Sequence, residues 1–300
     1  MIELTGLRIN NAQAVFAAYG LTRVLSERGL SVRLEWRVSD HRAVLSGCDW
    51  ETLKAHLAEH LKGREQAVEL NWADAIKKFP RERYRELMQS SDAKTRKWLE
   101  AYWHEPLTHP RSGQKRELAL AQTRLDMMAG PVRLFSGIRK TILELQKKDL
   151  DAELTKTLLQ AWINTDECFN PGWDWGAVKA GASISGGKPP DKTPARGVMA
   201  AVWLAFEALP WFPSRWLTHK KSANEVSWVI PHLAVSAAGI ESMLLAQQGL
   251  SVSELHAQNW SHWVACIAKN GEYGYLLPAA RTLSTTQNTA SPQAGARSVL

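Results

Sequence analysis

The sequence predicts an α+β fold, and three observations support this prediction. Residues 3–9 and 30–38 alternate apolar and polar side chains, as half-buried strands do. Residues 49–61 instead repeat leucines at helical spacing. The chain has 300 residues, of which 45% are hydrophobic, so it can bury a sizeable core. Intrinsic disorder is therefore excluded for most of the chain.

The N-terminal region, residues 1–75, is expected to be a small mixed α/β unit. Its predicted elements are a strand at 3–9, a helix from 12 to 25, strands at 30–38 and 43–45, and a helix from 50 onward. Asn11 and Asp49 precede the two helices, and such side chains cap free backbone N–H groups. Gly29 ends the first helix.

The middle region, residues 76–163, is expected to be mainly helical and basic. Prolines at 80, 106, 110 and 131 divide it into short helices. Pro131 suits the first turn of a helix, which then continues to Leu145.

The C-terminal region, residues 164–282, begins with an irregular segment and continues as an α+β unit with hairpins. Glycines and prolines dominate residues 164–194, and irregular segments of that length are commonly functional or mobile. The remaining predicted elements are a helix at 198–209, a hairpin within 215–230 turning near 222–224, a helix at 236–248 and a hairpin within 260–277 turning at Asn270-Gly271. Residues 283–300 are almost free of apolar side chains and predict a disordered tail.

The net charge of +7 is concentrated in one part of the sequence. Residues 76–148 hold 17 basic and 8 acidic side chains, a balance of +9, whereas residues 1–75 carry 9 and 10 and residues 149–300 carry 11 and 12. A basic block interleaved with aromatic residues is typical of a surface that faces phosphates. The same spacing also suits a solvated helical face.

Two patterns raise the alternative of a free-standing nucleic-acid hydrolase. His56-Leu57-Ala58-Glu59-His60 matches a zinc-hydrolase signature in which His56 and His60 hold the metal. The leucine stripe, however, places His60 at its border and Glu59 nearly opposite. Asp166, Glu167 and Asp174 could serve a metal-dependent nuclease. The sequence has neither a Walker-type phosphate loop nor a dinucleotide-binding glycine motif, so nucleotide hydrolysis is disfavoured.

Cysteine usage and hydropathy bear on the compartment. Three widely spaced cysteines cannot build a disulfide scaffold or a four-cysteine zinc site. The N-terminus lacks the pattern of a signal peptide, and no apolar run is long enough to span a bilayer. We therefore expect a cytoplasmic protein with no membrane partner.

Three stretches resemble a known family. Leu4 to Leu25, with Asn10-Asn11 before an Ala-Ala-Tyr-Gly-Leu helix, resembles the opening of the large-subunit-like (Cas8-type) proteins of subtype I-G, formerly I-U, CRISPR effector complexes. Residues 123–130, before Phe135, are similar to the family's central segment. Residues 169–175 and 200–213 are similar to its aromatic loop and to the helix that follows it. The resemblance covers about residues 1–215.

This resemblance implies a non-catalytic subunit of an RNA-guided antiviral defence complex, a Cascade-like assembly, and no cofactor. Its partners would be crRNA, target DNA with its flanking motif, other effector subunits and a helicase-nuclease. In such complexes base pairing reads sequence while protein holds the backbone. The expected phosphate contacts are Lys115, Arg116, Arg124, Arg133, Arg139 and Lys140, with Lys188, Lys192 and Arg196 on a loop that probes duplex DNA.

Trp173 and Trp175 flank Asp174 in a loop and are the best candidates for an exposed wedge or a stacking surface. Most of the 14 tryptophans are expected in the core. A third class of function stays open beside the effector subunit and the hydrolase. In it the basic face binds an acidic protein.

Overall fold

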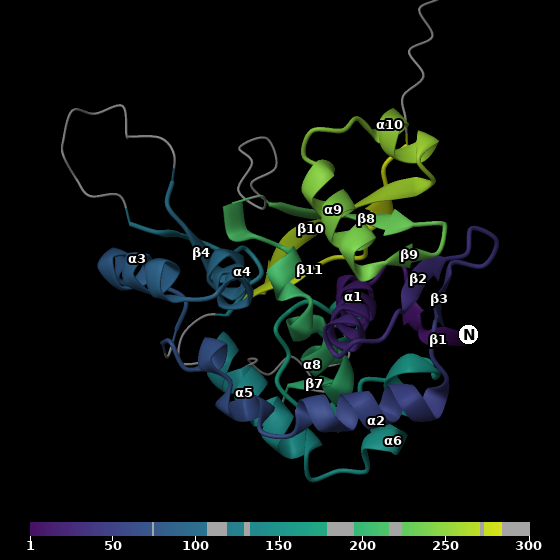
Figure 1. The fold of residues 1–300 in the computed structure, drawn as a ribbon, viewed down its shortest axis with the longest axis horizontal. Helices are drawn as coiled ribbons and strands as arrows, with labels where there is room; N and C mark the ends of the chain where they lie inside the picture. Colours follow the sequence, from purple (N-terminus) through teal and green to yellow (C-terminus); the bar gives the residue numbers. More distant parts are fainter. Residues whose placement is uncertain are drawn as a thin grey trace, which may run out of the picture.

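The first sheet joins three strands of the N-terminal region to one strand of the C-terminal region (Figure 1). The computed structural model describes residues 1–73, 75–106, 119–128, 133–178, 195–215, 224–270 and 273–283. The strands of this sheet are β1 (Ile2–Arg8), β2 (Arg33–Trp36), β3 (Arg42–Ser46) and β9 (Val235–Ser236). They are antiparallel in the order β1-β3-β2-β9. The C-terminal region therefore completes the N-terminal sheet.

Two central helices pack directly on each other. They are α1 (Ala12–Glu27) and α8 (Met199–Glu207), and nearly all of their residues are buried. Asn11 caps α1 by accepting hydrogen bonds from the backbone N–H groups of Gln13 and Ala14, as predicted. Gly20 allows the close approach, because a Cβ there would lie 1.8 Å from the Leu204 carbonyl oxygen.

The other helices surround this pair. Three of them lie together on one side, and α9 and α10 lie with the second sheet on the other (Figure 1). The first group consists of α2 (Trp50–Leu61), α5 (Leu134–Leu145) and α6 (Leu150–Leu158). The remaining helices are α3 (Arg81–Ser90), α4 (Ala93–Tyr102), α9 (Ala237–Ala246) and α10 (Val252–Ala257), with short 3₁₀ turns η1 (Arg64–Gln66), η2 (Val68–Leu70) and η4 (Leu209–Trp211).

The second sheet is built around one long strand. Its members are β8 (Glu225–Pro231), β10 (Trp260–Asn270), β11 (Tyr273–Leu276) and β12 (Ala280–Arg281). The predicted hairpin within 260–277 is confirmed, since Asn270 pairs with Tyr273. The predicted hairpin within 215–230 has one described strand, β8, which pairs with β10. Residues 216–223 lie outside the described residues.

Two short ladders complete the α+β fold. They are β4 (Trp103–His104) with β5 (Ala121–Gln122), and β6 (Asp166–Glu167) with β7 (Arg196–Gly197). One hydrophobic cluster runs through all three regions of the sequence. Among the described residues, five tryptophans are fully buried in it, namely Trp36, Trp103, Trp173, Trp203 and Trp228. Among the described residues, none of the helices combines the length and the apolar composition that a membrane span requires.

Candidate nucleic-acid interface

Three cations lie on α5 or next to its ends. Lys140 is on the helix, whereas Arg133 has extended backbone just before it and Lys147 lies in the turn just after it. Lys140 and Lys147 are exposed, and Arg133 is half-buried just before the helix. The opposite side of α5, which includes Phe135 and Ile142, is buried in the core.

Lys140 differs from Arg133 and Lys147 in having no partner among the described residues. Lys147 Nζ lies 2.9 Å from Glu144 Oε1 one turn earlier, and Arg133 has an interaction of its own. In the described part of the chain, the Lys140 ammonium takes part in no hydrogen bond or ion pair. An exposed ammonium of this kind can neutralise a phosphate without first breaking a contact within the protein.

Three further predicted contacts serve the fold. The Arg139 guanidinium is half-buried, and its Nη2 donates to the Leu70 carbonyl oxygen at 2.5 Å. Arg124 Nη1 lies 3.5 Å from the Glu225 carbonyl oxygen. Arg196 donates to the carbonyl oxygen of Thr165 at 3.2 Å. These three side chains therefore have partners within the protein. The other predicted contacts, Lys115, Arg116, Lys188 and Lys192, lie outside the described residues.

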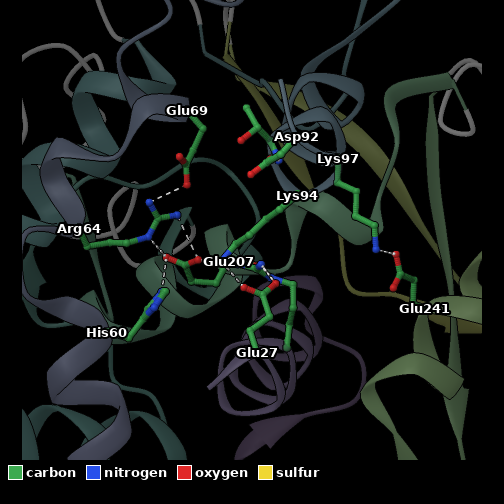
Figure 2. A network of polar contacts seen from close by, with 11 residues as sticks. Glu27, His60, Arg64, Glu69, Asp92, Lys94, Lys97, Glu207 and Glu241 are labelled. Atoms are coloured by element: carbon green, nitrogen blue, oxygen red, sulfur yellow. Dashed lines mark hydrogen bonds and ion pairs between the residues drawn. The ribbon is translucent and has the colours of Figure 1, made fainter. Parts of the chain in front are cut away.

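Acidic residues neutralise much of the basic middle region. Glu105 forms ion pairs with Arg81, at 2.5 Å, and with Arg85, at 2.6 Å. Hydrogen bonds from Arg85 and Arg81 lower the pKa of Glu105 to about 2. Lys94 reaches Glu27 on α1 at 2.6 Å, and a further pair joins α4 to α9 (Figure 2). The excess of +9 read from the sequence is therefore only partly available to a partner.

A buried ion network joins α1, α2, η1 and α8 (Figure 2). The Glu207 carboxylate is fully buried and contacts Arg23 at 2.7 Å, Arg64 at 2.7 Å and His60 at 3.3 Å. Burial alone would raise the pKa of Glu207, but Arg64, His60 and Arg23 outweigh it and hold that pKa well below its usual range. Arg64 also pairs with Glu69 at 2.7 Å. This network holds elements together inside the protein.

The predicted zinc signature is divided between two environments. His60 Nε2 faces the buried Glu207, whereas Glu59 is exposed and pairs with Lys62 at 2.7 Å. His56 is half-buried, and its Nδ1 has no hydrogen-bond partner. In the part of the chain that the structure describes, no three His, Cys, Asp or Glu side chains are grouped so that they could hold a metal ion. The described residues therefore contain no metal centre that would support the hydrolase hypothesis.

The three candidate carboxylates are likewise engaged separately. Asp166 pairs with Lys156 and lies 3.9 Å from Lys148. Glu167 is exposed and lies 3.9 Å from Arg196. Asp174 is buried, and no described residue forms an ion pair with it. These contacts favour structural roles for Asp166 and Glu167.

The two candidate wedge tryptophans differ. Trp173 is fully buried, and its indole N–H donates to the Leu125 carbonyl oxygen at 2.9 Å. The expectation that Trp173 is exposed is therefore wrong, because the loop folds inward and its indole packs edge-on against Phe16. Trp175 is half-buried and lines a small cavity together with Arg8, Trp162 and Asn164. These three residues belong to no motif, so the sequence analysis did not identify them.

No family model matches the chain, and no curated protein is significantly similar to it.

Proposed function

We propose that this chain is a non-catalytic subunit of an RNA-guided CRISPR surveillance complex of type I. In this proposal it binds the backbones of crRNA and target DNA, contributes to recognition of the flanking motif, and helps to recruit a helicase-nuclease in the cytoplasm. The observation that carries the proposal is the exposed Lys140 on α5, which forms no hydrogen bond or ion pair with another described residue and has Arg133 and Lys147 near the two ends of the same helix. A sequence-independent hold on phosphates is what such a complex requires from protein.

A second observation supports the proposal. Parts of the stretches that resemble the family, residues 12–25 and 200–207, fall on α1 and α8, which pack on each other through Gly20. Shared sequence at such a contact is what a common fold requires, since a helix pair this close depends on small residues.

The test is salt-dependent binding of single-stranded RNA and DNA by the full-length protein. We expect affinity to fall steeply with salt, because each phosphate contact contributes about 0.7–0.9 to the log–log slope. Lys140→Gln should reduce that slope by about one contact. Lys62→Gln, at the residue that follows α2, removes another exposed lysine, which pairs with Glu59, and serves as the matched control.

Assembly is measured in parallel. The chain is co-expressed with the neighbouring effector subunits and a guide RNA, and we expect it to co-purify with the RNA. Absence of nucleic-acid binding at 50 mM salt, both alone and in co-expression, would overturn the proposal. Equal salt slopes for the Lys140→Gln variant and the wild type would remove α5 as the interface.

A further inference from the structure

A two-residue basic turn lies between η2 and α3. Lys77 and Lys78 are both exposed, whereas the residues on either side, Ile76 and Phe79, are only 2% and 8% exposed. One buried side chain, Trp103, holds both flanks. Its indole N–H donates to the Ile76 carbonyl oxygen at 2.8 Å, and its ring stacks on Phe79 with the ring centroids 4.0 Å apart. The turn therefore presents its two lysines to solvent from a fixed base.

The backbone of Lys78 is left-handed, with a φ of 64°. This conformation is unfavourable for an L-residue with a side chain, and glycine adopts it without that cost. The other described residues with a positive φ, apart from glycines, are His41, Asn164 and Asn259, and both residue types adopt it more readily than most. Residues held in such conformations cluster at functional sites, so the strain at Lys78 favours a function for its side chain.

The two ammonium groups of the turn differ in their partners. In the part of the chain that the structure describes, the Lys78 ammonium takes part in no hydrogen bond or ion pair. Lys77 Nζ donates to the Met128 carbonyl oxygen at 2.9 Å, which uses one of its three N–H donors. The turn therefore has donors available for an anion.

The segment that carries the turn follows α5 toward the start of that helix. The Leu70 carbonyl oxygen accepts from Arg139 in the middle of α5 at 2.5 Å. Burial raises the pKa of Asp126, whereas a backbone hydrogen bond and the charges of Lys77 and Arg133 oppose this rise, so both cations lie near that half-buried carboxylate. The basic turn thus lies beside the end of α5 that begins after Arg133.

We propose that Lys78 contacts a backbone phosphate of the bound nucleic-acid strand, with Lys77 beside it as a second donor. This inference rests on the nucleic-acid binding proposed above, and it extends the interface from Lys140 on α5 to the turn before α3. An ammonium on a fixed turn neutralises a phosphate without breaking a contact within the described protein and with little ordering of the backbone. Contacts of this kind position the strand and do not read its bases.

The test measures binding of a fluorescein-labelled single-stranded RNA to the full-length protein by anisotropy at several salt concentrations. Lys78→Gly removes the ammonium and the unfavourable backbone conformation together. We expect the log–log slope to fall by about 0.7 and the affinity at 50 mM salt to fall about five- to tenfold. The matched control is His41→Gly, which places glycine at another exposed left-handed position, with a φ of 57°, between β2 and β3. It should keep the wild-type slope.

Further variants separate the charge of Lys78 from the shape of the turn. Lys78→Arg keeps the charge and should keep the wild-type slope. Lys78→Gly should melt about 1–2 °C above the wild type, because glycine relieves the left-handed conformation. Lys78→Gly combined with Lys140→Gln should lower the slope by about 1.4, because the two lysines contact separate phosphates.

The outcomes separate this contact from the function on which it rests. Equal slopes for the wild type and Lys78→Gly, with RNA bound by both, overturn the Lys78 contact and leave the contact at Lys140 intact. The Lys78 contact is also overturned if Lys78→Arg loses as much affinity as Lys78→Gly, or if Lys78→Gly melts several degrees below the wild type, because the shape of the turn would then explain the loss. Absence of RNA binding by the wild type at 50 mM salt overturns the contact together with the proposed function.

Discussion

Arg64 holds the buried carboxylate of Glu207 through two hydrogen bonds, from Nε to Oε1 at 2.7 Å and from Nη2 to Oε2 at 3.2 Å. The two residues are 143 positions apart in the sequence. Arg23 on α1 binds the same carboxylate at 2.7 Å. A single buried anion therefore fixes α8 against α1 and η1 at once.

Replacing Glu207 with glutamine should strongly destabilise the protein. The amide cannot balance the charges of Arg23 and Arg64, and breaking a buried ion pair on one side costs about 3–5 kcal/mol. The free energy of unfolding from urea titration at neutral pH measures this loss. Glu59→Gln removes an exposed carboxylate bound to Lys62, and should change the free energy by about 0.5 kcal/mol or less. A Glu207→Gln variant as stable as the control would contradict the role assigned to the network.

Gly20→Ala should separate α1 from α8. The added methyl group would overlap the Leu204 carbonyl oxygen, and backbone atoms on a buried helix cannot give way as a flexible side chain can. Overpacking of this kind costs about 1–3 kcal/mol or more, despite the better helix propensity of alanine. The matched control is Gly249→Ala, where the nearest atom to the new Cβ lies 3.8 Å away. The melting temperatures of the two variants should differ by several degrees. Equal melting temperatures would count against the tight α1–α8 contact.

Local patterns in the sequence predicted most elements of the fold. The Asn11 cap, the leucine stripe of α2 and the hairpin closed by Asn270 and Tyr273 all depend on neighbouring residues. The edge strand β9 was not predictable, because it is two residues long and belongs to the sheet only through its pairing with Arg33 and Leu34.

The candidate site was less predictable because charge and burial depend on distant partners. Counting charges could not show that Glu27 and Glu241, from outside the middle region, neutralise Lys94 and Lys97. Glycines near Trp173 suggested an exposed loop, although a carbonyl 48 residues away satisfies its indole.

The titration of Glu105 should make the stability of the fold depend on pH in the acidic range. Hydrogen bonds from Arg85 and Arg81 lower its pKa to about 2, from an ordinary value of 4.5. The carboxylate therefore stabilises the fold above about pH 4.5, and this contribution is lost as pH falls toward 2. Because Glu105 is partly exposed, solvent screening limits the contribution to about 1 kcal/mol at most.

The measurement for Glu105 compares melting temperatures of the wild type and Glu105→Gln at pH 6 and pH 2.5. The difference between the two proteins should shrink at the lower pH. Glu86→Gln, which removes the exposed partner of Arg83 on α3, should show a smaller difference at both pH values. A constant difference between wild type and Glu105→Gln would refute the assigned pKa shift.

His232 should make stability depend on pH near neutrality. Its Nδ1 lies 2.9 Å from the Trp36 carbonyl oxygen and therefore donates, so in the neutral ring Nε2 accepts from the Ser261 hydroxyl at 2.8 Å. Ser261 in turn accepts from the Trp263 indole at 2.8 Å. Protonation would turn Nε2 into a donor and leave the buried Ser261 hydroxyl hydrogen without its acceptor.

Burial lowers the pKa of His232, and the nearby Arg281, His41 and His256 lower it further, although the bond to Trp36 opposes this. The contribution of neutral His232 to the free energy of unfolding is therefore fully present above about pH 6.5. It is lost as pH drops through that value toward the pKa of His232 in the folded protein. His232→Gln keeps a donor and an acceptor but no titration, so its urea midpoint should vary less between pH 7.5 and 5. His41→Asn, whose φ of 57° asparagine tolerates, removes one of the groups that lower the pKa of His232 and should therefore reduce the slope only slightly. An unchanged slope in His232→Gln would assign the pH dependence to another group, such as His262, whose pKa burial also lowers.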